Sequence, residues 1–364
     1  MKQWIKEIAK GKKRAKDLTY EEATLASQSV INGDASDVQI AAFLIAERLK
    51  TESPDEVAAF VHSFRESASK IHLPQEISSR LIDFSGPYDG RKTFAATIPV
   101  SMLLAEKGIP VYLHGSDTLP PKYGTSLKDI FQSMGIPVQL TASQIAQSIE
   151  KNNIGFAWTE YLCPPLARIR TVREEIEVRS FINIAEKLLN LADSQGINLG
   201  IFHKTVLNTN VAILRRLGFQ KAYIVQGAEG SEDLPIHRKS FVYEVTANEV
   251  KPFDLNPDDY GLFCRKDPSK EVITAERQTK LITAILEGNT SENLDYYRNQ
   301  VIFNTAVRYF LYGYATSIDQ GITFTLEQLR AGKGARHLNK WRNFSRNILD
   351  LSQKFQFSDK VVAH

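Results

Sequence analysis

The chain has 364 residues, a length that suits two domains better than a single core. Hydrophobic residues make up 43% and charged residues 24%, the balance of an ordinary globular protein. The net charge is only +3, so the total charge does not predict nucleic-acid binding, which would have to come from local clusters.

The compartment is predicted from what the sequence lacks. No run of about eighteen apolar residues exists, so we expect no membrane-spanning helix. The start, MKQWIKEIAKGKKRAK, is too charged for a secretory signal, so we expect a cytoplasmic protein. Cys163 and Cys264 stand far apart, and two cysteines cannot form a disulfide framework or a four-cysteine zinc site.

Residues 1–75 are predicted to form a small all-helical domain. Three helices have start signals in which side chains satisfy backbone N–H groups of the first turn. These signals are Thr19 with Glu22, Ser36 with Gln39, and Ser53–Pro54 with Glu56. Apolar residues follow at helical spacing, as between Val38 and Leu49.

Residues 76–162 and 191–364 are predicted to form a larger α/β domain. Short β-rich runs alternate with helical stretches, which indicates a mixed, mostly parallel sheet flanked by helices. Residues 241–255 are predicted to add a hairpin, and helices are expected at 275–287 and 291–316. The β-rich runs are Ile109–Leu113, Gly155–Trp158, Leu199–His203 and Ala222–Val225.

Two polar segments have the composition of an anion site. Residues 85–93 carry glycines, Arg91 and Lys92 before a helix N-terminus, which suits an anion, although a turn with solvated cations has the same composition. A later run of arginines suits a carboxylate or phosphate as well as a solvated surface. This run contains Arg168, Arg170, Arg173 and Arg179.

Two further segments follow predicted strands, where ligands of open α/β sheets gather. His114 opens the segment 114–126, and a lone histidine is more often a packed residue than a catalyst. The segment 227–233 ends in Glu232 and Asp233. These carboxylates are able to hold Mg²⁺ through its waters, and they fit a solvated acidic turn equally well.

The order of these segments resembles the anthranilate phosphoribosyltransferase family over nearly the whole chain, and pyrimidine nucleoside phosphorylases more distantly. The opening helices look like that family's helical domain. Asp89-Gly90 with Thr93-Phe94 falls at its glycine-rich diphosphate loop, and His114-Gly115 falls in its K-H-G-N motif. GAEGSEDL stands at its magnesium motif, and Asn304-Thr305-Ala306 resembles its late N-A-A helix.

The resemblance implies a cleft between the domains that binds phosphoribosyl diphosphate, and Mg-assisted transfer of the glycosyl group to an aromatic amine or an altered acceptor. It also implies a homodimer through the helical domain, and helices from about 163–190 that pack onto that domain. His114 and Arg173 would bind the acceptor, Glu232 and Asp233 would hold Mg²⁺, and no residue is assigned as a general base. The phosphate-binding residues would be Gly86, Asp89, Gly90, Arg91, Lys92, Thr93, Thr97, Lys122 and Gly124.

The departures from the family pattern are concentrated at this chemistry. The G-T-G-G-D-G loop keeps only its last two residues, and Pro87 removes a backbone donor where Tyr88 adds bulk. Leu113 replaces a lysine, and Pro120 and Pro121 replace two serines that would donate to phosphate. Each lost contact to a charged group is worth roughly 1.5–3 kcal/mol. We therefore expect a divergent member with weak or lost turnover of the usual substrates.

The alternative is a non-catalytic nucleic-acid-binding member of the same family. Cations that neutralise phosphates beside aromatic rings that stack on bases would suit single strands. There are two basic clusters, and the second is explained equally well by a charged helix face that covers an aromatic core. The clusters are Lys10, Lys12, Lys13, Arg14 and Lys16, and then Arg330, Lys333, Arg336, Lys340, Arg342 and Arg346 with Trp341 and Phe344.

Overall fold

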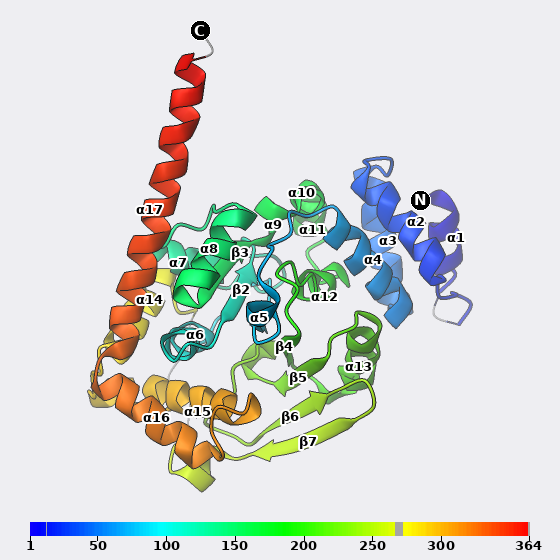
Figure 1. Ribbon diagram of the computed structural model, residues 1–364. Coiled ribbons are helices and arrows are strands. Elements are labelled where there is room, and N and C mark those ends of the chain that lie inside the picture. The colour runs from blue at the N-terminus through cyan, green and yellow to red at the C-terminus, as the bar shows by residue number, and fades with distance from the viewer. Residues whose placement is uncertain (12, 266–271, 363–364) are drawn as a thin grey trace.

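The computed structural model describes residues 1–11, 13–265 and 272–362, with side chains up to residue 351 (Figure 1). A bundle of helices from the start of the chain lies beside a seven-stranded mixed sheet that is flanked by helices (Figure 1). This arrangement confirms the predicted fold class. None of the described helices is long and apolar enough to cross a bilayer.

The helical bundle begins each of its main helices at the predicted signal. The Thr19, Ser36 and Ser53 hydroxyls each accept a bond from the amide three residues later, whose side chain bonds back. These reciprocal bonds confirm the three capping boxes. The bundle comprises α1 (Lys2–Ile8), α2 (Tyr20–Ile31), α3 (Asp37–Lys50) and α4 (Pro54–Glu66).

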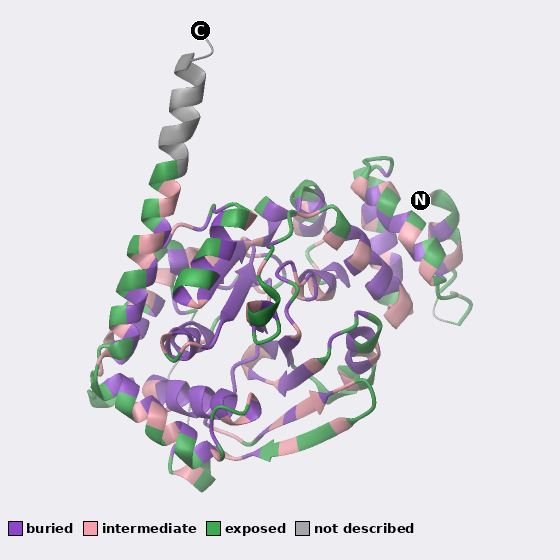
Figure 2. Cartoon of the chain, in the orientation of Figure 1, coloured by how far each residue is buried: buried purple, intermediate pink, exposed green. Residues whose placement is uncertain are grey.

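The sheet has the strand order β3-β2-β1-β4-β5-β6-β7. The first five strands run parallel, and the β6–β7 hairpin pairs antiparallel, as predicted. Strands β1 to β4 are buried almost throughout, whereas the edge strand β7 is largely exposed (Figure 2). The strands are β1 (Ile82–Ser85), β2 (Val111–Gly115), β3 (Ile154–Trp158), β4 (Gly196–Ile201), β5 (Lys221–Gln226), β6 (Ser240–Val245) and β7 (Val250–Leu255).

The strand order places a topological switch point between β1 and β4. From β1 the chain proceeds to β2 and β3 on one side, and then returns to β4 on the other side. The loops that leave the carboxyl ends of β1 and β4 therefore diverge and open a crevice between them, which is where open α/β sheets bind ligands.

Helices flank the sheet and connect it to the bundle. The longer ones are α6 (Thr97–Glu106), α8 (Ala142–Asn152), α13 (Leu207–Arg216), α14 (Ala275–Leu286), α15 (Asp295–Leu311), α16 (Ile318–Arg330) and α17 (Lys333–Val362). The shorter ones are α5 (Gln75–Ser78), α7 (Leu127–Ser133), α9 (Thr159–Leu162), α10 (Pro164–Arg168), α11 (Arg170–Glu175) and α12 (Ile182–Lys187).

The segment that contains α12 contacts both parts of the molecule. Phe181 packs edge-to-face on Phe60 of α4, with ring centroids 4.8 Å apart. On the other side, the Ser85 hydroxyl of β1 donates to the Lys187 carbonyl at 2.6 Å. The predicted division into residues 1–75 with about 163–190, and the remainder of the chain, stays a prediction.

A charge cluster lies in the helical bundle, and its side chains are buried except for Asp17, which is 63% exposed. The Lys50 ammonium lies 2.7 Å from Glu56, 2.8 Å from Asp17 and 3.2 Å from Glu47. Three carboxylates thus face one cation, and Glu47 is fully buried. Burial, followed by the nearby Glu56 carboxylate, raises the pKa of Glu47 to about 8.

Glu47 should therefore make stability depend on pH. A carboxyl whose folded pKa lies above its unfolded value stabilises the fold at low pH, and this contribution is lost as the pH rises through about 8. We expect Glu47→Gln to unfold at a higher temperature than the wild type above that pH, with a gain on the order of 1 kcal/mol. Thermal unfolding at a series of pH values measures this. The exposed Glu21→Gln is the control, and equal pH slopes for Glu47→Gln and the wild type would contradict the expectation.

Candidate functional site

The loops after β1, β2 and β5 meet at the carboxyl edge of the sheet. The loop after β1 pairs with the loop after β2, because the Arg91 amide donates to the Thr125 carbonyl and the Gly124 amide donates to the Asp89 carbonyl. A side chain on Gly90 would lie 2.2 Å from the Gly124 carbonyl oxygen, so the two loops pack backbone against backbone. The predicted donors of Arg91 and Gly124 are thus used between the loops.

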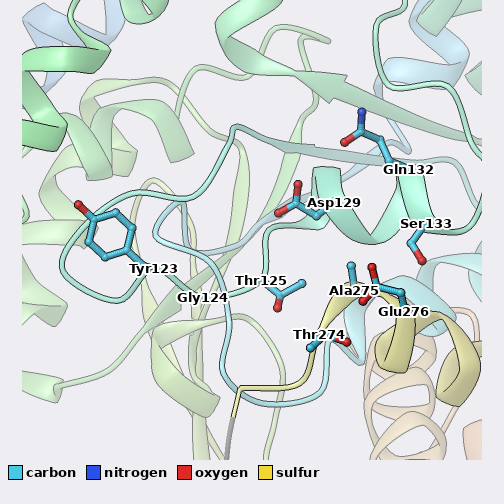
Figure 3. Close-up of a pocket in the computed structure, with 9 residues that line it drawn as sticks. All are labelled: Tyr123, Gly124, Thr125, Asp129, Gln132, Ser133, Thr274, Ala275 and Glu276. Carbon is cyan, nitrogen blue, oxygen red and sulfur yellow. The ribbon is translucent and has the colours of Figure 1, made fainter.

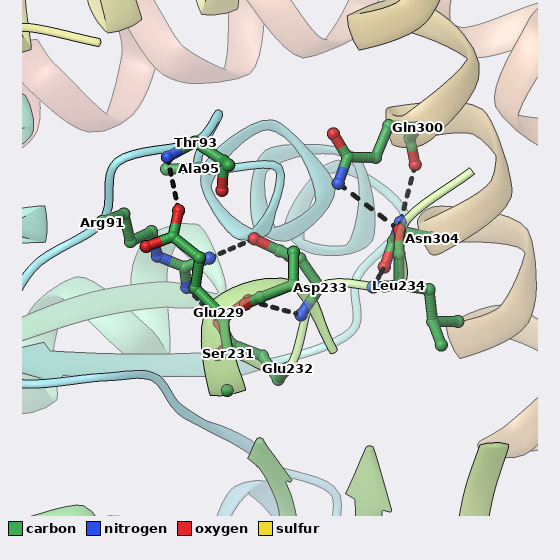
Figure 4. Close-up of polar contacts among 12 residues, drawn as sticks. Arg91, Thr93, Ala95, Glu229, Ser231, Glu232, Asp233, Leu234, Gln300 and Asn304 are labelled. Atoms are coloured by element: carbon green, nitrogen blue, oxygen red, sulfur yellow. Dashed lines mark hydrogen bonds and ion pairs between the residues drawn. The ribbon is translucent and has the colours of Figure 1, made fainter. Parts of the chain in front are cut away.

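The two carboxylates predicted to hold magnesium bind Arg91 instead. Its guanidinium lies 2.7 Å from Glu232 and forms a second ion pair with Asp233, and all three side chains are buried (Figure 4). Burial acts to raise the pKa of Glu232, but the Arg91 guanidinium holds it below its usual range. In the described part of the chain, no group of three His, Cys, Asp or Glu side chains is placed to hold a metal. In this structure Arg91 neutralises both carboxylates, and the assignments of Glu232 and Asp233 to Mg²⁺ and of Arg91 to phosphate stay predictions.

Helix α15 holds the loop that carries Glu232 and Asp233 in place. The Asn304 amide group accepts from the Leu234 backbone N–H and donates to the Leu234 carbonyl, each at 2.8 Å (Figure 4). The Arg308 guanidinium donates to the Glu232 carbonyl and, at 2.7 Å, to Asn304. A buried two-way bond of this kind leaves the loop little freedom to move its carboxylates.

A carboxylate of the chain also occupies the predicted phosphate position. Glu229 accepts from the Thr93 amide at 2.6 Å (Figure 4). It also accepts from the Lys92 amide at 3.0 Å. The Lys122 ammonium lies 3.2 Å from Glu229 and 3.4 Å from Asp89. Burial acts to raise the pKa of Glu229, but Lys122 and the amide bonds lower it overall. The N–H groups and the cation predicted to bind phosphate thus bind a carboxylate of the protein itself, and their binding of phosphate stays a prediction.

The predicted acceptor residues are likewise engaged inside the protein. Arg173 pairs with Glu186 at 2.7 Å, and both side chains are buried. His114 is buried between the Asp83 carboxylate, 2.9 Å from its Nε2, and the Tyr88 hydroxyl, 2.5 Å from its Nδ1. In this geometry His114 fixes Tyr88, which also lines the pocket described next.

A pocket of about 260 Å³ opens at the switch point between β1, β4 and α12. Its walls are mainly apolar, and Asp89 is the predicted phosphate residue among those that line it. Lys187 and Arg179 add cations, and Arg179 pairs with Asp89. Burial lowers the pKa of Lys187 to about 8. The apolar wall comprises Pro87, Tyr88, Ile184, Leu199, Ile201, Phe202 and Val206.

The remaining predicted residues lie near this pocket or behind it. Gly86 is packed against Arg91 and Glu232, where a side chain would lie 3.1 Å from the guanidinium. Thr97 is buried in the first turn of α6, and the Lys92 side chain is exposed. The sequence thus brings the predicted set to one edge of the sheet, but the tertiary contacts turn most of its charges toward one another.

A second, more open groove lies between the loop at Tyr123 and the first turn of α14 (Figure 3). Its charged residues are Asp129 and Glu276, and no cation is found among the described residues that line it. A groove with this charge repels phosphate and carboxylate ligands, so we do not assign the site there.

The basic cluster on α17 does not present its tryptophan to solvent. Trp341 is 1% exposed, and its indole N–H donates to Ser148 at 2.8 Å. Arg346 donates to the Gly135 carbonyl just past α7, and Lys340 to the Lys151 carbonyl in the last turn of α8, where the helix dipole favours cations. The helix is thus a charged face over an aromatic core. Nucleic-acid binding stays a prediction, and Lys12 of the first cluster lies outside the described residues.

The homodimer and the cytoplasmic location also stay predictions. An apolar groove of about 250 Å³ between α1 and α3 is lined by Ile8, Ile45 and Leu49, with Leu49 exposed to 69%. An apolar groove with an exposed leucine is compatible with a contact between two copies of the helical bundle.

The structure is that of an α/β protein with a helical bundle and a pocket at the switch point of its sheet, and comparison with known proteins gives the family. Residues 82–335 match the α/β domain of the glycosyl transferase family, and residues 2–68 match its helical bundle domain. The chain belongs to this family, and its resemblance to the anthranilate phosphoribosyltransferases is confirmed.

The relatives cover nearly the whole chain. The anthranilate phosphoribosyltransferase of Methanosarcina acetivorans is 30% identical over 349 residues, which are 96% of this chain and 90% of the relative. That of Persephonella marina is 28% identical over 348 residues, or 95% and 99%. These values establish a common family rather than a common substrate.

Solved structures share the fold. The anthranilate phosphoribosyltransferase from Thermus thermophilus has a TM-score of 0.79 at 23% identity, over 94% of this chain and 99% of that one. The Saccharomyces cerevisiae enzyme, in complex with phosphoribosyl diphosphate and Mg, has a TM-score of 0.81 at 16% identity, over 95% and 97%. At these identities the likeness concerns the fold alone.

Four residues of the site were not singled out from the sequence. Glu186 and Lys187 lie on α12, after the arginine run, and nothing in their sequence spacing marks them as functional residues. Glu229 belongs to the acidic segment but precedes the pair that matched a motif. Asp83 lies in a four-residue strand that reads only as a short apolar run.

Proposed function

We propose that the protein binds a small ligand in the switch-point pocket and does not catalyse Mg-assisted transfer from phosphoribosyl diphosphate. The observation that carries this proposal is that its own side chains occupy three positions assigned to ligands. Arg91 takes the place of the metal, Glu229 that of a phosphate, and Glu186 that of the acceptor carboxylate. These three groups are thus already paired within the protein before any substrate arrives.

The free energy needed to break these internal ion pairs lowers the affinity for a metal-bound diphosphate. To admit a metal-bound diphosphate, Arg91 would have to leave Glu232 and Asp233, and Glu229 would have to leave the Lys92 and Thr93 amides. Breaking one buried ion pair costs about 3–5 kcal/mol. At 1.4 kcal/mol for each factor of ten, affinity would fall by roughly two to three and a half powers of ten.

The names of the relatives indicate which substrates to test. The relatives are named anthranilate phosphoribosyltransferases, and the yeast enzyme has been solved with phosphoribosyl diphosphate and Mg. Phosphoribosyl diphosphate and an aromatic amine are therefore the substrates to test first. Transfer requires that the departing diphosphate be neutralised where its charge develops, and the residues suited to this are already paired with one another.

Titration calorimetry with phosphoribosyl diphosphate tests the proposal directly. We expect no Mg-dependent heat with the wild type, and no diphosphate release when anthranilate is added. Mg-dependent binding at micromolar concentrations, or diphosphate release that requires the amine, would refute the proposal.

Removing the internal anion should open the phosphate position. Glu229 has a φ of 55°, which glycine adopts without strain, so Glu229→Gly frees the two amides and leaves the turn intact. We expect this variant to bind inorganic diphosphate at least about tenfold more tightly than the wild type, since one charge-assisted bond is worth about 1.5–3 kcal/mol. Glu177→Gly, also at a φ of 55°, is the matched control. Equal affinity of Glu229→Gly and Glu177→Gly would show that Glu229 does not block the position.

A further inference from the structure

A second pocket, of about 280 Å³, lies at the opposite edge of the sheet from the switch-point pocket. Its lining includes Gly196 and Lys221, the first residues of β4 and β5. We call it the amino-edge pocket. It shares no lining residue with the switch-point pocket, so the two pockets are separate sites. Its other lining residues are Ser79, Arg80, Leu81, Gln195, Gln220, Tyr312 and Tyr314.

Two tyrosines just past α15 contribute aromatic surface to the amino-edge pocket. Tyr312 is held in place, because its hydroxyl accepts from the Asn198 side chain at 2.9 Å and its ring packs edge-to-face on Tyr223. A Cβ at Gly196 would lie 3.4 Å from a ring carbon of Tyr312, so this ring lies close to the backbone of β4. The Tyr314 side chain is 36% exposed and forms no hydrogen bond or ring contact in the described part of the chain. One fixed ring and one free ring suit a flat aromatic ligand.

The described residues that line the amino-edge pocket include two cations and no carboxylate. Lys221 lies 3.0 Å from Glu244 of β6 in a partly exposed ion pair. The Arg80 Nε donates to the Glu76 carbonyl at 3.1 Å, and Arg80 forms no ion pair with any described residue. The two terminal amino groups of its guanidinium therefore remain available for a ligand. A guanidinium of this kind is suited to phosphate, which accepts two parallel bonds from it.

Two glutamines supply the groups that would recognise the edge of the ring. The side-chain amides of Gln195 and Gln220 form no hydrogen bond with any other described residue. Each amide offers one acceptor and two donor hydrogens, the set that pairs with the N6 amino group and N7 of adenine. A cavity of about 150 Å³ holds benzene, so about 280 Å³ has room for two fused rings. Arg80, Gln220 and Tyr314 are exposed, so the rest of the ligand extends into solvent.

We propose that the amino-edge pocket binds an adenine nucleotide with a single phosphate. Its base would lie against Tyr312 and Tyr314, with its edge on the two glutamines and its phosphate on Arg80. The proposal does not rest on the function proposed for the switch-point pocket, because the two sites share no residue. A free nucleotide fits better than a nucleic-acid strand, which needs several cations to neutralise successive phosphates. The amino-edge pocket offers two cations, and Lys221 is already paired with Glu244.

Calorimetry with AMP, and with adenosine as the matched ligand without phosphate, tests the site. We expect AMP to bind at least about tenfold more tightly than adenosine, the factor expected of one charge-assisted bond. Arg80→Gln should bind both ligands equally weakly. Tyr314→Ala should weaken both by about fivefold or more, because it removes a ring that stacks on the base. Arg277→Gln, at an exposed position of α14 without an ion pair to any described residue, is the control and should behave as the wild type.

A variant that should gain affinity gives a readout that loss of structure would not imitate. Glu244→Gln releases Lys221 from its carboxylate and keeps an acceptor for the Tyr223 hydroxyl. We expect it to bind AMP up to about fivefold more tightly than the wild type, and adenosine as the wild type does. Thermal unfolding without nucleotide checks that each variant is folded.

Several results would overturn the proposal. They are no binding of AMP by the wild type, equal affinity for AMP and adenosine, and undiminished affinity for AMP in Arg80→Gln or Tyr314→Ala. GMP that binds as tightly as AMP would show that the glutamines do not recognise adenine. A short oligoadenylate that binds more tightly than AMP would assign the pocket to a strand instead of a free nucleotide.

Discussion

Arg91→Ala is expected to lower the free energy of unfolding by about 3–5 kcal/mol, because it leaves two buried carboxylates without their cation. Glu232 and Asp233 are 0% and 1% exposed, and Asn304 and Arg308 hold their loop in place. Both carboxylates are buried, so the variant must either lose stability or find another cation.

The same variant should become sensitive to Mg²⁺. With the guanidinium gone, the space beside two carboxylates suits a divalent ion that keeps several of its waters. Calorimetric unfolding with Mg²⁺ and with a chelator measures this, and a ligand at a hundred times its Kd adds about 2.7 kcal/mol. The wild type should show no such difference.

Two further variants make the Arg91 prediction specific. Arg179→Ala removes a half-exposed guanidinium from Asp89 and should cost less than about 1 kcal/mol. Adding Glu232→Gln and Asp233→Asn to Arg91→Ala should recover much of the lost stability and abolish the response to Mg²⁺, because no charge remains to be neutralised. An Arg91→Ala variant as stable as the wild type in chelator would mean that Arg91 is not the internal counter-ion.

Trp341→Ala is expected to lower the free energy of unfolding by about 3–5 kcal/mol, the usual range for removing a buried large aromatic side chain. Trp341 packs edge-to-face on Phe131 of α7, with centroids 5.4 Å apart, and its N–H bonds to Ser148 of α8. The side chain therefore ties α17 to two helices of the α/β domain. Unfolding by urea measures the loss.

This prediction also separates the two interpretations of the α17 cluster. Leu351→Ala, on the same helix and 54% exposed, should leave stability nearly unchanged. A tryptophan that stacked on bases would behave differently: its removal would weaken binding of a single-stranded oligonucleotide and leave the unfolding free energy as it was. That result would restore the nucleic-acid hypothesis for this helix.

Local interactions made the helical start signals readable from the sequence. The boxes at Thr19, Ser36 and Ser53 each join groups three residues apart, so their energy does not depend on the rest of the fold. The β6–β7 hairpin was predicted correctly because its two strands are neighbours in the sequence.

Strand β4 begins at Gly196, earlier than the predicted β-rich run that starts at Leu199. Pairing with β1 and β5 outweighs the poor strand propensity of glycine and asparagine there.

The candidate functional site could be predicted only in part from the sequence. The motif order brought the predicted residues to one edge of the sheet, because loops after parallel strands must share that edge. The direction in which each charge points depends on partners far away in the chain. Arg91 and Lys92 are neighbours that looked like two ligands of one anion, yet Arg91 turns inward to Glu232, which lies 141 positions away.

Local sequence patterns were enough to predict the family and the two kinds of architecture. The pairing of Arg91, Glu229 and Arg173 inside the protein could be known only from the three-dimensional structure. The reason is physical: an ion pair is a property of two positions in space, and burial makes it strong enough to decide what else is able to bind.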